Sequence, residues 1–190
     1  MLFRSLHAQI WYWSWMTVFA GSTVGLSVGA ATTDHGADRA NYISQAVLSA
    51  SGVGDLLFRP FEARFGADPI RGLPETTAEE RRRKLERAEG LLRANAARAA
   101  TRTSWPLHLL NAAANGAAGL IVWAAGDGEA GAISALTGTL SGEAYIWTEP
   151  GGPVQDLKDY QRFRSAQPAR AAGGWSIVPA LGGVNVQYRF

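Results

Sequence analysis

The sequence predicts a mainly α-helical membrane protein, in which four spans form two repeated helical hairpins. Three observations predict this fold. Four long runs are almost free of charged residues, the runs pair across short acidic turns, and the Lys and Arg residues gather outside them. The expected parts are a first transmembrane hairpin at 1–60, a connection with a basic amphipathic helix at 61–104, a second transmembrane hairpin at 105–150, and a C-terminal surface helix and β-hairpin at 151–190.

The four charge-poor runs have the length of membrane spans. A helix needs about 20 residues to cross a hydrocarbon layer of about 30 Å. In chain order, the runs are 10–31 with 22 residues, 40–58 with 19, 103–126 with 24 and 130–148 with 19. The second run carries one acid, Asp55, and the fourth carries one acid, Glu143, each near its end. The runs therefore predict two helical hairpins.

The two hairpins show the marks of an internal repeat. Glu143 follows Asp55 by 88 residues, and Trp105 follows Trp15 by 90 residues. Small residues precede each acid at intervals of four, and a proline follows it, Pro60 in the first hairpin and Pro150 in the second. Aligned positions at one offset are typical of a duplicated unit. Compositional coincidence in a chain rich in Ala and Gly is the alternative explanation.

Small residues mark two helix faces that allow another backbone to approach closely. Gly21, Gly25 and Gly29 recur every fourth residue in the first run, and Ser134, Gly138 and Gly142 do so in the fourth. Such stripes are typical of packed helices in membranes, where van der Waals contact drives association. We therefore predict helix packing at both stripes. The alternative is the ordinary small-residue content of such helices.

The first run also permits a different interpretation. Arg4 provides a positive region before the apolar run, and Val28-Gly29-Ala30 resembles a signal-peptidase site. In that case the protein is an exported helical bundle of the bacterial periplasm or outer membrane. The cluster of aromatic residues between Ile10 and Met16 favours a span, because Trp and Tyr prefer the membrane interface.

A basic amphipathic helix is predicted between the hairpins. Thr76 and Glu79 have the spacing of a capping box, so we expect the helix to begin there. Its basic cluster is Arg81, Arg82, Arg83 and Lys84, for which we predict contact with anionic lipid headgroups. A solvated helix face is the alternative. Interleaved Glu residues and the absence of a recognition motif argue against nucleic-acid binding.

The distribution of charge predicts the orientation in the membrane. If the two acidic turns lie outside, 17 of the 18 Lys and Arg residues lie on the opposite side. Basic residues favour the cytoplasmic side of membrane proteins. We therefore expect a bacterial inner membrane with both termini in the cytoplasm.

A stripe of polar residues is predicted inside the membrane. His108, Asn111 and Asn115 follow the spacing i, i+3 and i+7, so they share one face of the third span and are able to face Glu143 and Asp55. Polar residues at this depth are costly, so they are candidates for a function such as ion or proton passage. The alternative is that they join helices through hydrogen bonds.

The C-terminal region changes pattern. Val154 to Arg164 is expected to form a short surface helix, and apolar residues alternate with polar ones from Val184 to Phe190, which is typical of a strand. Trp175 to Val178 is its expected partner strand.

The sequence favours a function without catalysis. It has no cysteine, three widely spaced His residues and none of the common phosphate-binding, zinc or nucleophile motifs, so we expect no metal and no cofactor. We expect a structural or accessory subunit of a membrane assembly, whose partners are the lipid bilayer and other subunits or copies of itself. A small channel or transporter with a polar intramembrane path is the second hypothesis, and the exported bundle is the third.

Overall fold

The computed structural model describes residues 2–59, 61–166, 174–180 and 183–189. The protein is mainly α-helical, and it divides into two compact units, one up to Asp156 and the other from Leu157. In chain order the elements are α1 (Leu2–Thr32), α2 (Gly36–Phe58), η1 (Glu62–Phe65), α3 (Asp68–Arg71), α4 (Ala78–Arg102), α5 (Trp105–Ala124), α6 (Gly128–Thr148), α7 (Gly152–Ala166), β1 (Gly174–Ala180) and β2 (Gly183–Arg189). Pro60, Phe190 and residues 181–182 lie outside the described residues.

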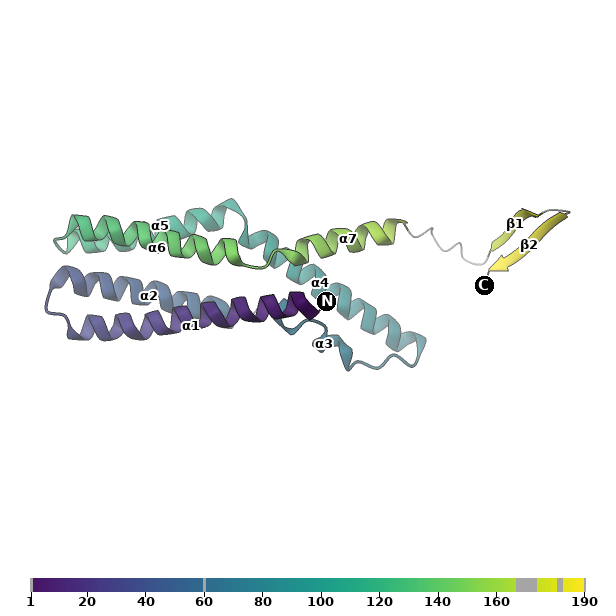
Figure 1. Ribbon diagram of the computed structural model, residues 1–190, viewed down its shortest axis with the longest axis horizontal. Coiled ribbons are helices and arrows are strands. Elements are labelled where there is room, and N and C mark those ends of the chain that lie inside the picture. Colours follow the sequence, from purple (N-terminus) through teal and green to yellow (C-terminus); the bar gives the residue numbers. More distant parts are fainter. Residues whose placement is uncertain (1, 60, 167–173, 181–182, 190) are drawn as a thin grey trace. The chain divides into compact units, whose positions relative to one another are not determined.

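The first unit contains two antiparallel helical hairpins, α1–α2 and α5–α6. Both turns lie at the same end of this unit (Figure 1), so the two hairpins have the same orientation. Two residues determine the conformation of the turn between α5 and α6. Gly126 has a φ of 111°, which glycine adopts without strain, and Asp127 caps α6 because its Oδ1 accepts a hydrogen bond from the Ala130 N–H at 2.8 Å. The acidic turn residue therefore starts the returning helix.

Close backbone contact holds α5 against α6. A side chain at Gly119 would collide with the Gly131 carbonyl oxygen, and it would lie 2.7 Å from the Ala135 Cβ. In α1–α2 the glycines instead accommodate aromatic rings. Gly52 lies under the ring of Phe19, to which an added Cβ would approach within 2.8 Å. Both hairpins use glycine to allow contact, but only the second brings two backbones together.

The hydrophobic core lies at the end of the first unit opposite the two turns. It consists of Ala8, Trp11, Tyr12, Leu56, Phe61 and Tyr145. The Trp11 and Tyr145 rings stack at a centroid distance of 5.1 Å, and Phe61 meets Trp11 edge to face at 5.6 Å. The aromatic residues at this end of the unit differ in burial. Trp11 and Tyr145 are buried, whereas Trp105 and Trp147 are exposed.

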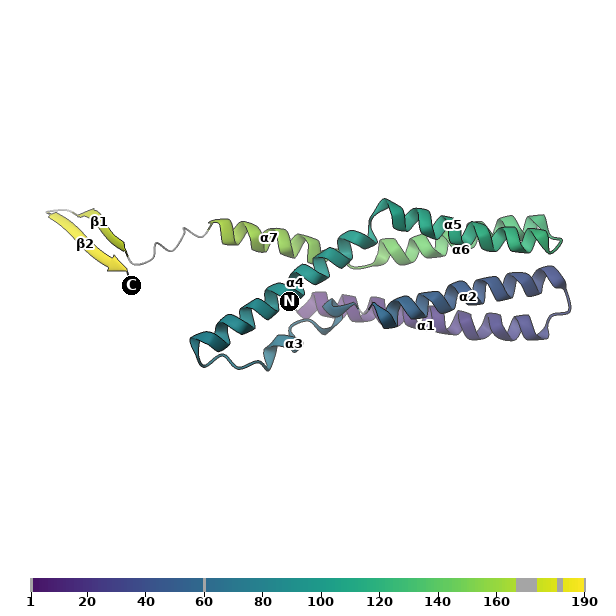
Figure 2. The same cartoon turned by 180° about the vertical axis from the view of Figure 1, so that it is seen from behind.

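The connection between the hairpins is more ordered than a simple loop. It contains η1 and α3, and then α4, which leads to the second hairpin (Figure 2). The helix α4 begins one residue later than predicted. Thr77, not Thr76, accepts from the Glu80 N–H at 3.1 Å, and the Glu80 carboxylate accepts from the Thr77 N–H at 2.9 Å. This backbone hydrogen bond holds the pKa of Glu80 below its usual value.

The second unit contains the end of α7 and a two-stranded sheet. Strands β1 and β2 pair antiparallel, with Trp175 opposite Tyr188 and Ile177 opposite Val186. Seven residues form each strand.

One helix among the described residues meets both the length and the composition of a membrane span. This helix is α5, with 20 residues, which correspond to about 30 Å. The remaining long helices of the hairpins contain more Gly, Ser and Thr or an acid, which lowers their hydropathy.

We predict that Gly119→Ala destabilises the second hairpin by about 1 to 3 kcal/mol, because the added methyl group forces the two backbones apart. Gly116→Ala is the matched control, since nothing lies within 4 Å of a side chain there, and it should be neutral or slightly stabilising. Denaturant titration of the purified variants measures both effects. Equal stability of the two variants would contradict the close backbone contact.

Candidate functional site

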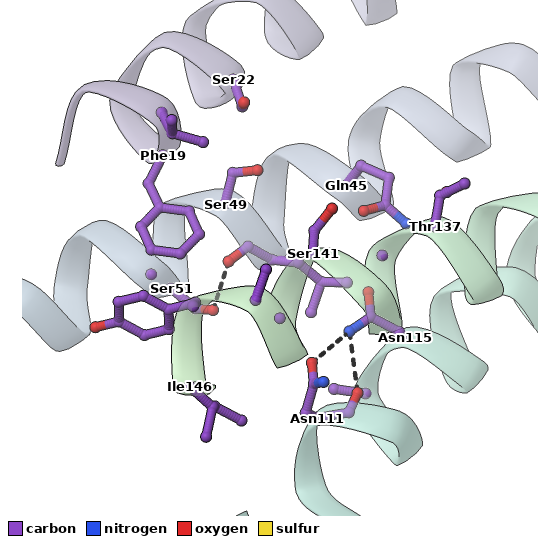
Figure 3. A pocket seen from close by; sticks show the side chains of 18 of the residues that line it. Phe19, Ser22, Gln45, Ser49, Ser51, Asn111, Asn115, Thr137, Ser141 and Ile146 are labelled. Carbon is purple, nitrogen blue, oxygen red and sulfur yellow. Dashed lines mark hydrogen bonds between the residues drawn. The ribbon is translucent and has the colours of Figure 1, made fainter. Parts of the chain in front are cut away.

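A cavity of about 880 Å³ lies between the two hairpins. It is lined by residues of α1, α2, α5 and α6, among them Phe19, Gln45 and Asn115 (Figure 3). Arg102 at the end of α4 also lines it. Its walls combine apolar side chains with amides and hydroxyls. A volume of this size falls within the range of small-molecule sites, which are lined mostly by apolar groups with a few polar ones. The cavity is therefore the candidate functional site.

Two amides and one hydroxyl join α2 to α6 at the cavity wall. Gln45 Nε2 donates to Ser134 Oγ at 2.9 Å, and Ser134 Oγ donates to Asn41 Oδ1 at 2.7 Å. Ser134 is buried. Because the hydroxyl donates to one amide and accepts from the other, this contact ties the two hairpins together near the turns.

Two asparagines of α5 lie against the predicted small-residue stripe of α6. Asn115 Oδ1 lies over Gly138 and Asn111 Oδ1 lies over Gly142, each so close that any side chain at the glycine would collide with the amide. Asn115 Nδ2 donates to Asn111 Oδ1 at 2.9 Å (Figure 3). The stripe Ser134, Gly138 and Gly142 therefore packs within this chain, where it makes room for polar side chains.

The row of hydrogen bonds extends from these amides to Glu143 and His108. Asn111 Nδ2 donates to Glu143 Oε1 at 2.9 Å, and His108 Nδ1 lies 2.6 Å from Glu143 Oε2. Trp147 Nε1 donates to the same Oε2 at 3.1 Å. Neither His108 nor Glu143 lines the cavity, whereas Asn111 does. The structure thus brings four of the five predicted polar residues into one hydrogen-bonded row, which includes Asn115.

The fifth predicted residue, Asp55, belongs to a separate group of charged residues. This group lies at the end of the cavity opposite the turns. Tyr145 donates to Asp55 Oδ2 at 2.9 Å, and Arg102 Nη1 lies 3.0 Å from the same oxygen. Arg59, four residues along the chain, pairs with Asp55 Oδ1 at 3.1 Å, as expected for neighbours on a helix. Asp55 thus contacts α4 and α6 at once.

Glu149 completes the cluster from the end of α6. Its Oε2 accepts from Arg102 Nε at 2.8 Å, and its Oε1 accepts from Arg98 Nε at 3.2 Å. Only 2% of the Glu149 side chain is exposed. Arg98 also donates to the Arg59 carbonyl oxygen. We name the five residues Asp55, Arg59, Arg98, Arg102 and Glu149 the charged cluster.

The buried guanidinium of Arg102 is the centre of this cluster. Burial alone lowers its pKa, but Tyr145, Glu149 and Asp55 outweigh burial and raise the pKa above its usual value. The guanidinium carbon also lies 4.6 Å from the centroid of the Tyr145 ring, a cation–π contact. Arg102 therefore stays charged. Its Nη2 and that of Arg98 are buried, and neither has a hydrogen-bond partner in the described part of the chain.

The remaining predicted residues lie elsewhere in the first unit. Nothing lies within 4 Å of a side chain added at Gly21 or Gly25, whereas one at Gly29 would touch the Tyr42 ring at 3.1 Å. The basic residues of α4 lie at its exposed N-terminal end. Arg82 and Arg83 pair with Glu79 at 2.9 Å, Lys84 pairs with Glu75 at 2.8 Å, and Arg81 donates to the Thr76 carbonyl oxygen at 2.8 Å.

Sequence reasoning missed several residues of the site. Asn41 and Gln45 line the cavity, and Arg102 and Glu149 form its charged end, although no motif marked them. A signal was present for Glu149. It follows the fourth charge-poor run directly, and Arg98 and Arg102 precede the third, so a hairpin brings these charges to one end.

We predict that Glu149→Gln lowers the free energy of unfolding by about 3 kcal/mol, because two buried guanidinium groups lose their shared carboxylate. Glu86→Gln removes an exposed partner of Arg82 and serves as the matched control, with an expected effect below about 1 kcal/mol. Thermal or denaturant unfolding of both variants measures the difference. Similar losses in the two variants would contradict a buried ionic connection.

The site offers amides, hydroxyls, carboxylates and guanidinium groups as binding groups. Over the described parts of the chain, no three His, Asp or Glu residues are placed to hold a metal ion together. Comparison with known proteins identifies no relative: no family model, no curated protein and no solved structure matches the chain.

Proposed function

We propose that this chain is a non-catalytic multi-pass membrane protein, in which α1, α2, α5 and α6 each cross the bilayer. The observation that carries this proposal is the polarity of the two hairpins. Large apolar side chains on all four helices point away from the chain, among them Val24, Val47, Leu120 and Leu136, with exposed fractions of 66%, 63%, 63% and 61%. Polar side chains such as Ser134 and Asn115 are buried between the helices.

This distribution is the reverse of that in a water-soluble bundle. In water, apolar residues gather inside and polar residues cover the surface. In a bilayer, the surrounding lipid is apolar, and polar side chains are favoured inside, where they bond to one another across helices. Exposed large apolar side chains on each of the four helices therefore support a lipid environment for all four.

The ends of the helices support an orientation. Both turns lie at one end of the first unit, and α4 with its basic residues leads from the opposite end. The turn segments carry one basic residue, Arg39, whereas eleven lie between Asp55 and Ser104. By the preference of basic residues for the cytoplasmic side, we place the turns outside and α4 inside a bacterial inner membrane, with both termini cytoplasmic.

Within the membrane, we propose that the protein acts as a structural or accessory subunit of a larger assembly. Gly21 and Gly25 lie on α1 with open space around them, so this face is able to accept another helix at short distance. The protein itself, other subunits and lipid are the proposed partners. The basic end of α4 is suited to anionic headgroups at the cytoplasmic surface.

A second candidate function is a small channel or transporter. The observation that favours it is the presence of polar side chains at successive levels of the cavity, from Asn41 and Gln45 near the turns to Asn115 and Asn111. The charged cluster, with Arg102 at its centre, then lies at the cytoplasmic end of the path. Flux in liposomes that Asn115→Leu abolishes would favour this function.

The topology is tested by single cysteines, since the native chain has none. Gly36 and Ala125 lie at the turns, and Ala94 and Ala166 lie on α4 and α7. In intact cells, an impermeant thiol reagent should label Gly36→Cys and Ala125→Cys, but label Ala94→Cys and Ala166→Cys only after the membrane is opened. If all four positions react alike in intact cells, the four-span proposal is wrong.

The accessory role is tested at the open face of α1. Gly25→Leu should disperse the native assembly in mild detergent, because the larger side chain keeps a neighbouring helix away. Gly116→Leu places the same side chain in open space on α5 and should leave the assembly intact. Sedimentation velocity of the purified proteins compares the two. An unchanged profile for Gly25→Leu would count against assembly through α1.

A further inference from the structure

The cavity between the hairpins opens sideways between α1 and α6. All ring contacts and hydrogen bonds described between these two helices lie at the end with the charged cluster, where Trp11, Trp15 and Phe19 meet Tyr145 and Thr148. Val18 of α1, next to Phe19, and Ile133 of α6, nearer the turns, also line the cavity and are half exposed. A molecule in the surrounding lipid is therefore able to enter without crossing a helix.

The charged end of the cavity has an excess of positive charge. The charged cluster contains three guanidinium groups and two carboxylates. Arg59 and Arg102 both line the cavity. Arg102 is more than nine-tenths buried, and its Nη2 has no acceptor within the described residues. A buried donor without an acceptor and an uncompensated positive charge both favour an anion at this end.

Two hydroxyls follow at a greater depth in the cavity. Ser141 precedes Tyr145 by four residues, and Ser49 precedes Asp55 by six, so they lie about 6 Å and 9 Å further along their helices. Both line the cavity (Figure 3), and neither hydroxyl has a hydrogen-bond partner among the described residues. They are therefore available as donors to a ligand.

Beyond the hydroxyls, apolar side chains accompany the cavity toward the turns. Leu48 of α2, Leu26 of α1 and Ile133 of α6 line this part. Its amides are used within the chain, since Gln45 and Asn41 bond to Ser134. The wall thus changes from cationic, through hydroxyl donors, to apolar side chains interspersed with amides that are bonded within the chain. The polar layer of one bilayer leaflet is about 5 to 8 Å thick, so hydroxyls about 6 Å and 9 Å from the charged cluster lie close to its inner boundary.

We propose that this cavity is a binding site for one anionic glycerophospholipid of the leaflet on the Arg-rich side. Its phosphate contacts Arg59 and Arg102, its ester carbonyls accept hydrogen bonds from Ser49 and Ser141, and one acyl chain fills the cavity between α1 and α6. This inference rests on the proposed membrane location. A zwitterionic lipid leaves the excess positive charge uncompensated, and a free phosphate leaves the apolar part of the cavity empty.

The test uses the full-length protein, purified in detergent and incubated with an equimolar mixture of phosphatidylglycerol and phosphatidylcholine of identical acyl chains. Native mass spectrometry then counts the bound lipids. We expect one phosphatidylglycerol molecule per chain to be retained at least fivefold over phosphatidylcholine. Equal retention of the two lipids overturns the proposal.

A variant and its matched control test where the lipid headgroup binds. Arg59→Gln should reduce the preference for phosphatidylglycerol about fivefold, because Asp55 keeps Arg102 and Tyr145 as partners while the headgroup loses a cation. Arg71→Gln removes an exposed Arg that pairs with Asp68 and should leave the preference unchanged. Loss of preference in both variants, or in neither, overturns the assignment of the headgroup.

The acyl chain is tested by filling the cavity. Ser141→Phe places a ring in the opening and should abolish retention of the lipid, whereas Ala132→Phe adds the same ring on an exposed part of α6 outside the cavity lining and should have no effect. Circular dichroism confirms that each variant keeps its helices. Retention of the lipid by a folded Ser141→Phe overturns the proposal.

A soluble competitor and membrane extraction distinguish a lipid site from a simple anion site and from a wrong membrane location. Glycerol 3-phosphate in excess should not displace the bound lipid, and displacement would show an anion site without a lipid site, which overturns the proposal. If alkaline carbonate releases the chain from membranes, the membrane location fails, and this inference fails with it. If the chain resists carbonate but retains both lipids equally, only the lipid site fails.

Discussion

The buried contact of Arg102 with Asp55 and Glu149 is the interaction on which the rest of the first unit depends. Asp55 belongs to α2, Arg102 to α4 and Glu149 to the end of α6, so one guanidinium joins both hairpins to the helix that connects them. Tyr145 adds a hydrogen bond to Asp55 and a ring face for Arg102, and its ring also stacks on Trp11 of α1. The hairpins also meet through α2 and α5 and through the aromatic rings of α1 and α6. The ion pairs therefore determine how the two hairpins lie at this end.

A second constraint is that polar side chains occupy the space between helices whose outer faces are apolar. Space for them comes from glycine. Gly138 and Gly142 have no side chain, and Asn115 and Asn111 occupy the room that a side chain there would fill. If leucine stood at positions 138 and 142 of α6, the two asparagine amides would have no room there. Their hydrogen bonds would then be lost. The asparagines also connect the cavity with Glu143 on the far side of α5–α6. Small residues in α6 thus serve the interior of this chain, whereas Gly21 and Gly25 in α1 remain open.

The helices were predictable from the sequence because their signals are local. Runs without charge marked α1, α2, α5 and α6 to within a few residues at most boundaries, although α1 extends further toward the N-terminus than its run. The capping box of α4 was misplaced by one residue because Thr76 and Thr77 each have a Glu three positions later. The contacts of His108 and Asn111 with Glu143 followed from their shared helix face and a short turn.

The contacts between distant residues were not predictable. The Arg102–Glu149 pair spans 47 residues and the Gln45–Ser134 bond spans 89, and helical spacing does not relate such positions. The burial of Tyr145 likewise depends on distant residues, because Trp11, Arg102 and Asp55 contact it.

The charged cluster contains more guanidinium groups than are needed to join α2, α4 and α6. One guanidinium between two carboxylates is enough to join α2, α4 and α6, and Arg102 has this position. Arg98 strengthens the contact with Glu149, but its second terminal nitrogen, like that of Arg102, is buried and has no acceptor among the described residues. Arg59 adds a third positive charge to the cavity lining, where it is well exposed and pairs with a carboxylate that Arg102 already neutralises. Stability alone would favour pairing the buried Nη2 groups of Arg98 and Arg102, since unmet buried donors cost free energy. An anionic headgroup at this position supplies the missing acceptor and the missing charge together, while its acyl chain covers the apolar wall that α1 and α6 leave open.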